Sequence, residues 1–279
     1  MNNLTARLKK GLQPLQCLAL IGLCCVGSAQ AEMVQLNPNQ DNTLYERPMG
    51  DVSNAIGNGL FFGQTGGNAG NLLRRTLMSF DVNNTIPSGS TINSVSLQIS
   101  VDMVPPGATP IDINLHRLTN SWGEGTSEAV GAGGSGAPST TGDATWLHRF
   151  YDTDLWSTPG GDFIPQSSAT TTIGAGTGDF TFVSTPELVA DVQSWVDTPA
   201  SNNGWILLGA EATTRSARRI SSRENGAGAP MLVVDFTAPV NPPPPPPGAV
   251  AVPTLNGAGL ALLMLGIMVM MARRLKSRA

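Results

Sequence analysis

The chain has 279 residues, of which 20 are acidic and 16 basic, and its formal net charge at neutral pH is −4. All the acidic residues lie between Glu32 and Asp235, where the only basic residues are nine arginines, so this stretch carries a formal charge of −11. Such a surface repels nucleic acid and anionic lipid, which excludes a nucleic-acid partner. A polyanionic ligand would require a local arginine cluster or a bound cation.

Residues 1–31 are typical of a secretory signal peptide. A basic start precedes a short apolar run over residues 15–26, and a small-x-small cleavage site follows at Ala29 and Ala31. We therefore expect signal peptidase to release an exported protein that begins at Glu32. All three cysteines lie within the signal, so the mature protein has no thiol for a disulfide, a metal site or a nucleophile.

Residues 32–237 are long enough to form one substantial core. Short β-branched and apolar runs between turn residues predict strands at residues 76–82, 94–101, 111–118, 180–183, 204–208 and 231–236. Apolar and polar residues alternate over residues 94–101, as in a strand with one buried face. The sequence therefore predicts an all-β fold, an antiparallel β-sandwich of jelly-roll type. Residues 129–142, rich in Gly, Ala, Ser and Thr, are expected to form a long loop.

One short amphipathic helix is predicted over about residues 185–197. Thr185 is a suitable N-cap, and Pro186 stands at the first helical position, where proline is favoured. An apolar stripe predicts the buried face, and Glu187, Asp191 and Ser194 are expected to face away from it. The stripe comprises Leu188, Val189, Val192, Trp195 and Val196.

Aromatic side chains gather near residues 143–163. Trp146, Tyr151 and Trp156 lie in or beside one loop, and exposed rings of this kind stack on the apolar faces of sugars. They are candidate ligand-binding residues. The alternative is that they pack in the core.

The same loop concentrates three carboxylates, Asp152, Asp154 and Asp162, around Gly160 and Gly161. Hard cations such as calcium require several oxygen ligands from a flexible loop, so these aspartates are candidate calcium ligands. The alternative is that Asp and Gly only form turns here.

Four arginines form the one basic cluster between the signal and the tail: Arg215, Arg218, Arg219 and Arg223. They are candidates for binding an anionic ligand such as a uronic polysaccharide; the alternative is a set of internal salt bridges.

The sequence gives little indication of catalysis, because the only histidines are His116 and His148 and no hydrolase motif is present. The acidic residues would permit a glycosidase pair, whose separation a sequence cannot measure.

The C-terminal residues are typical of a segment that inserts into a membrane. Residues 238–251 are a proline-rich linker, an extended spacer with six consecutive prolines. Residues 252–279 contain an uncharged apolar run followed by a basic tail, which predicts a transmembrane helix with its basic end in the cytoplasm.

This tail resembles the IPTL-CTERM class of bacterial C-terminal sorting signals. The residues that carry the resemblance are Val252, Pro253, Thr254, Leu255, Gly259, Arg273 and Arg274; Asn256 and Ala258 depart from the Ser and Trp that are usual in the class. The resemblance implies processing by an exosortase-like sorting enzyme. The alternative is a plain membrane anchor.

Most of residues 37–237 resembles the DNRLRE domain of bacterial surface proteins. The matching segments are RRTLMSFDV (74–82), IPSGSTINSVSLQI (86–99), HRLTNSWGEGTS (116–127), DATWLHRF (143–150), LWSTPGGDF (155–163), LVADVQSWV (188–196), NNGWILLG (202–209) and SSRENGAGAPMLVVDF (221–236). The resemblance implies a non-catalytic jelly roll similar to carbohydrate-binding modules, some of which bind alginate or related uronic polysaccharides. We therefore expect an envelope protein that binds polysaccharide or extracellular matrix. The alternatives are a purely structural surface protein and an envelope polysaccharide hydrolase or lyase.

Overall fold

The computed structural model describes residues 30–240, most of which lie in β-strands and their connections. The longer strands are β1 (Ala31–Leu36), β2 (Gln40–Tyr45), β4 (Gly59–Gln64), β5 (Leu73–Ser79), β6 (Thr91–Met103), β7 (Ile111–Leu118), β11 (Phe163–Ile173), β12 (Gly178–Phe182), β13 (Trp205–Leu208), β14 (Arg218–Ser221) and β15 (Met231–Thr237). The two-stranded pairs are β3 (Val52–Ser53) with β8 (Ala137–Pro138), and β9 (His148–Phe150) with β10 (Asp154–Leu155). The helices are α1 (Pro186–Asp197) and the 3-10 turns η1 (Gly67–Ala69), η2 (Pro199–Ser201) and η3 (Arg223–Gly228).

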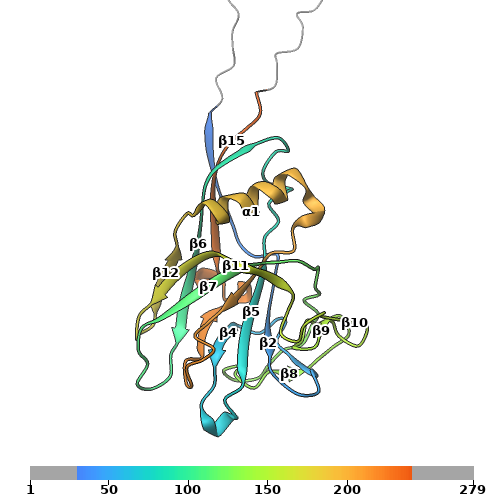
Figure 1. Cartoon of the computed structure of the whole chain (residues 1–279), viewed down its shortest axis with the longest axis vertical. Coiled ribbons are helices and arrows are strands. Elements are labelled where there is room, and N and C mark those ends of the chain that lie inside the picture. The colour runs from blue at the N-terminus through green and yellow to red at the C-terminus, as the bar shows by residue number, and fades with distance from the viewer. Residues whose placement is uncertain (1–29, 241–279) are drawn as a thin grey trace, which may run out of the picture. The chain divides into compact units, whose positions relative to one another are not determined.

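Eleven strands form one curled sheet in the order β1-β15-β6-β14-β4-β5-β13-β7-β11, with β12 beside β6 and β2 beside β5 (Figure 1). Each pairing that joins these strands is antiparallel. The predicted antiparallel all-β fold is confirmed at this level. All six predicted strands overlap observed ones, and residues 111–118 coincide with β7.

The sheet curls at β4. Residues 59–62 of this strand pair with β14, whereas Gly63 and Gln64 pair with β5. Gly63 has φ +96°, in the left-handed region that favours glycine, and a Cβ there would lie 3.0 Å from the carbonyl oxygen of Ser216. One glycine therefore lets a single strand pass between the two halves of the sheet.

The main core is apolar and lies against both halves of the curled sheet. It includes alternate residues of β6 (Val95, Leu97, Ile99 and Val101), which are buried as the sequence pattern predicts. Apolar residues of β7, β13, β15 and α1 also contribute to the core. Burial of this kind contributes about 25 cal/mol per Å² of apolar surface.

Helix α1 packs against β6 and β11 and covers one end of the core (Figure 1). The Thr185 hydroxyl accepts a hydrogen bond from the Leu188 N–H at 3.0 Å, which confirms the predicted N-cap. Trp195 is fully buried, with its ring centroid 4.4 Å from that of Trp205, so it is a core residue as expected.

The prediction that Asp191 faces away from the core is wrong. Residue 191 follows Leu188 by three positions and precedes Trp195 by four, so helical geometry places it on the apolar stripe. Its carboxylate accepts hydrogen bonds from Trp205 Nε1 at 2.8 Å and from Ser168 Oγ at 2.5 Å. These two donors allow an ionisable side chain to be buried there.

Several predicted features lie outside the described residues: the signal peptide up to Ala29, most of the linker at residues 238–251, and the membrane segment at residues 252–279. Within residues 30–240, no helix has the length and apolar character needed to cross a membrane. The predicted loop over residues 129–142 is irregular apart from β8, which pairs with β3.

Candidate functional site

The tryptophans predicted to form a sugar platform are buried. Trp146 is 8% exposed and Trp156 4%, and both belong to a second apolar cluster that includes Leu44, Leu77 and Ile206. Their placement is fixed by polar contacts: Trp156 Nε1 donates to the Thr145 carbonyl at 2.9 Å, and the Arg75 guanidinium lies 5.0 Å from the Trp146 ring centroid. Both indoles are core residues, so the prediction of an exposed platform is wrong for them.

Tyr151, the third predicted platform residue, is half-buried. Its ring meets that of His148 edge-on, with the ring centroids 5.3 Å apart. The other histidine, His116, packs on Phe163 and contacts the Ile164 carbonyl through Nδ1 at 3.0 Å. These contacts are those of structural side chains.

The three aspartates predicted to bind calcium do not converge. Asp162 accepts N–H groups from Ser157 and Thr158 at 2.8 and 2.9 Å, so it closes a turn. Asp154 is half exposed and lies 3.6 Å from Arg149 Nη2. Asp152 occupies a turn with φ +63°. The three aspartates therefore do not form a shared calcium site: they are not among the described carboxylates that converge, and Asp154 and Asp162 serve separate local contacts.

The four clustered arginines separate into two groups. Arg219 forms a two-pronged ion pair with Asp102, with N–O distances of 2.7 and 3.0 Å, and Arg223 forms one with Glu124 at 2.8 Å for both bonds. These two follow the salt-bridge alternative. Arg215 and Arg218 have no carboxylate within 4.0 Å among the described residues. The alternation of β14 turns Arg218 toward the interior and Arg219 outward.

Arg215 and Arg218 lie at a hollow that we call the distal groove. It consists of one depression of about 570 Å³, lined by residues 65–69, Pro105, Arg215 and Ala217, and another of about 250 Å³, lined by residues 106–109, Ile111, residues 213–216 and Arg218. Arg215 lines both depressions. It is exposed, and its Nη2 donates to the Pro106 carbonyl at 3.4 Å.

Arg218 is 2% exposed, and its guanidinium is only partly satisfied. Nη2 donates to the Thr109 carbonyl at 2.6 Å, while Nε and Nη1 have no hydrogen-bond partner. Burial lowers the pKa of the Arg218 guanidinium, because removal from water disfavours its charge. Arg218 therefore places a buried positive charge next to the groove, and such a charge favours an anion bound nearby.

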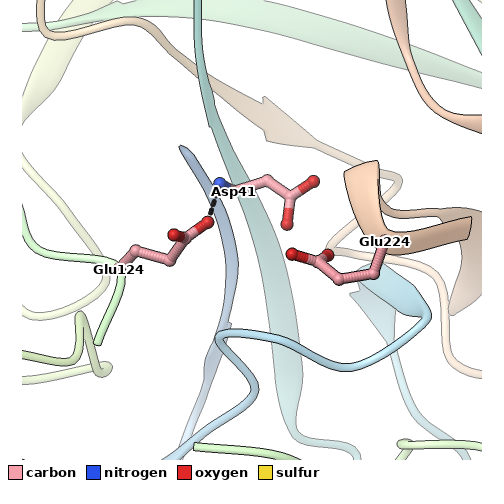
Figure 2. A group of neighbouring side chains, drawn as sticks. All are labelled: Asp41, Glu124 and Glu224. Atoms are coloured by element: carbon pink, nitrogen blue, oxygen red, sulfur yellow. Dashed lines mark hydrogen bonds between the residues drawn. The ribbon is translucent and has the colours of Figure 1, made fainter. Parts of the chain in front are cut away.

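A second group of side chains comes from three distant segments: Asp41 of β2, Glu124 of the segment after β7, and Glu224 of η3. One oxygen of each carboxylate lies within 4.8 Å of the others (Figure 2). Glu124 Oε1 accepts the Asp41 backbone N–H at 2.8 Å, the bond drawn in Figure 2. We call this group, with Arg223, the acidic cluster.

Arg223 holds the acidic cluster together. Besides its pair with Glu124, its Nε lies 3.0 Å from Glu224 Oε1, and its backbone N–H donates to Asp41 Oδ2 at 2.7 Å. Two buried oxygens, Asp41 Oδ1 and Glu224 Oε2, have no hydrogen-bond partner. Burial raises the pKa of the Asp41 carboxyl well above its ordinary value, and the neighbouring glutamates add to this.

The acidic cluster was not predicted from the sequence, because its residues are 83 and 100 positions apart. The one local indication was the adjacent pair Arg223 and Glu224. Asp41 and Glu124 stand in polar stretches that have no metal-site spacing of their own.

In the comparisons with known proteins, no family model matches the chain and no curated protein matches it.

Proposed function

We propose that the chain is an exported, non-catalytic binding module of the cell envelope, and that its distal groove binds acidic polysaccharide. The observation that carries the proposal is the pair Arg215 and Arg218, two arginines without a carboxylate partner at the same hollow. The antiparallel β fold, which we assign to the jelly-roll type, and the resemblance to the DNRLRE domain support this function.

The distribution of charge supports an anionic ligand. Among the described residues, five of the nine arginines pair with carboxylates, as expected where acidic residues are in excess. Of the four that do not, two lie at the groove and the others are Arg47 and Arg74. A uronic acid carboxylate can accept bidentate bonds from a guanidinium, and the small and polar side chains of residues 65–69 leave room for a chain of sugar rings.

The geometry also suits display from a surface. Ala31 of β1 pairs with Thr237 of β15, so both ends of the described unit leave it side by side (Figure 1). Thr237 lies beside Thr91, at the start of β6, and the groove begins beyond Met103, at its end. A strand of this length spans about 40 Å. The groove therefore lies at the opposite end of β6 from the point where the proposed tether, residues 238–279, begins.

Export and anchoring complete the proposal. Signal peptidase removes residues 1–31, and the tail that begins at Val252 holds the protein in the membrane until an exosortase-like enzyme processes it. Until that processing, the linker spaces the binding module from the membrane.

The test is direct binding by the full chain, purified in detergent. Alginate oligosaccharides and neutral malto-oligosaccharides of equal length are titrated by calorimetry at low and high salt. We expect binding of alginate alone, weakened by salt, and at least tenfold weaker binding by Arg215→Gln. Arg149→Gln removes an arginine that is paired with Asp154 and serves as the matched control.

Two outcomes would overturn the proposal. If no uronic oligosaccharide binds, the chain is better described as a structural surface protein. If reducing ends accumulate during incubation with alginate, it is a hydrolase or lyase instead.

A further inference from the structure

Contacts within the fold hold the side chains of the acidic cluster in one arrangement. Its carboxylates come from three segments, and each is fixed by a contact within the fold: Asp41 by the Arg223 N–H, Glu124 by the Arg223 guanidinium and the Asp41 N–H, and Glu224 by Arg223 Nε. Asp41 is fully buried. Such fixed carboxylates cannot separate to relieve their mutual repulsion.

The positive charge within the acidic cluster is too small to neutralise its carboxylates. When all three carboxylates are ionised, the one guanidinium leaves two negative charges, and Arg223 directs Nε and Nη2 to Glu124. It reaches neither Asp41 Oδ1 nor Glu224 Oε2, which stay buried without a donor. A buried carboxylate oxygen without a partner costs free energy, and a cation bound to the cluster would reduce that cost.

From this geometry we propose that Asp41, Glu124 and Glu224 bind one divalent cation of the calcium type. The ligand set consists of oxygen alone, which hard cations prefer, and one oxygen from each of the three carboxylates lies within 4.8 Å of the other two, close enough to surround one ion. Water supplies the remaining ligands. Arg223 stays on the Glu124 side and fixes the carboxylates around the ion.

This site replaces the loop of Asp152, Asp154 and Asp162 as the place where calcium acts. It is separate from the distal groove, so it does not depend on the proposed polysaccharide. Its effect is on the fold: the ion would join β2, the segment after β7 and η3, and so stabilise the native state by mass action.

The test uses the full chain in detergent, freed of metal with chelator. Calcium chloride or magnesium chloride is titrated at constant ionic strength while the thermal midpoint is followed, and equilibrium dialysis counts the bound calcium. We expect one calcium per chain, a midpoint that rises with calcium, and at least tenfold weaker binding by Glu224→Gln and by Asp41→Asn. Glu211→Gln is the matched control, because Glu211 forms a similar two-pronged pair with Arg75 but has no further carboxylate in a metal-binding group.

A midpoint that neither ion changes, or dialysis without bound calcium, would overturn the proposal and favour a proton shared by Asp41 and Glu224. Binding by Glu224→Gln equal to that of the wild type would do the same. If Asp41→Asn does not fold, dialysis of the wild type and of Glu224→Gln still decides, since Glu224 is partly exposed and tolerates an amide.

Discussion

The contact between α1 and the sheet depends on the buried carboxylate of Asp191, and we expect its removal to lower the free energy of unfolding. In Asp191→Ala, the indole N–H of Trp205 and the hydroxyl of Ser168 lose their acceptor in a site where both residues are at most 4% exposed. An unsatisfied buried donor costs about 1–3 kcal/mol, and the Ser168 hydroxyl can rotate to another acceptor, so we expect a loss of roughly 3 kcal/mol. Arg117, 3.7 Å away and partly exposed, can be hydrated and adds little.

The assay is urea and heat unfolding of the full chain in detergent, followed by tryptophan fluorescence. In a domain of this size 1 kcal/mol corresponds to about 2–4 °C, so the midpoint should fall by roughly 6–12 °C. Asp191→Asn keeps one acceptor oxygen and should lose less than half as much. Glu187→Ala, an exposed change on the same helix, should cost less than about 1 kcal/mol. If Asp191→Ala stays within 1 kcal/mol of the wild type, or if the Asn variant is equally unstable, the reasoning is refuted.

Three further changes test other contacts by the same unfolding assay. Thr185→Ala removes the N-cap of α1 and should cost about 1 kcal/mol; Thr181→Ala, an exposed change, is its control. Gly63→Ala adds a Cβ to a left-handed residue next to the Ser216 carbonyl and should cost at least about 1 kcal/mol, whereas the open Gly67→Ala should not; equal midpoints would show that β4 bends without the glycine. Arg218→Met removes a buried, unpaired charge and should stabilise the fold by about 1 kcal/mol while it weakens alginate binding; a loss of stability would mean that Arg218 serves the fold.

Strands with alternating or continuous apolar side chains were predictable, and a polar strand with two buried faces was not. In β6, apolar residues at every second position mark one buried face. Polar β2 reads Gln-Asp-Asn-Thr-Leu-Tyr, yet five of its six residues are buried. The reason is tertiary: Asn42 Oδ1 accepts hydrogen bonds from Ser53 Oγ and the Asn54 N–H, contacts that no local pattern reveals.

The candidate sites show the same limit. The arginine cluster could be recognised in the sequence. Only the register of β14 shows that Arg218 is buried whereas Arg219 pairs with Asp102. The acidic residues of the loop near residue 152 were close in sequence and apart in space. Asp41, Glu124 and Glu224 were the reverse, and the fold alone brings them together.

The pairing of β15 with β6 has a mechanical consequence. β15 ends at Thr237, next to the start of β6, and β6 ends at Met103, beside the distal groove. If the chain is tethered beyond Thr237 and a ligand pulls on the groove, the two strands are drawn in opposite directions along their length. Their hydrogen bonds are then loaded together in shear, whereas a peeling force would break them one at a time. A cell held by such a protein would depend on the unfolding rate under force, so the contacts between β6 and β15 would set how long the attachment lasts.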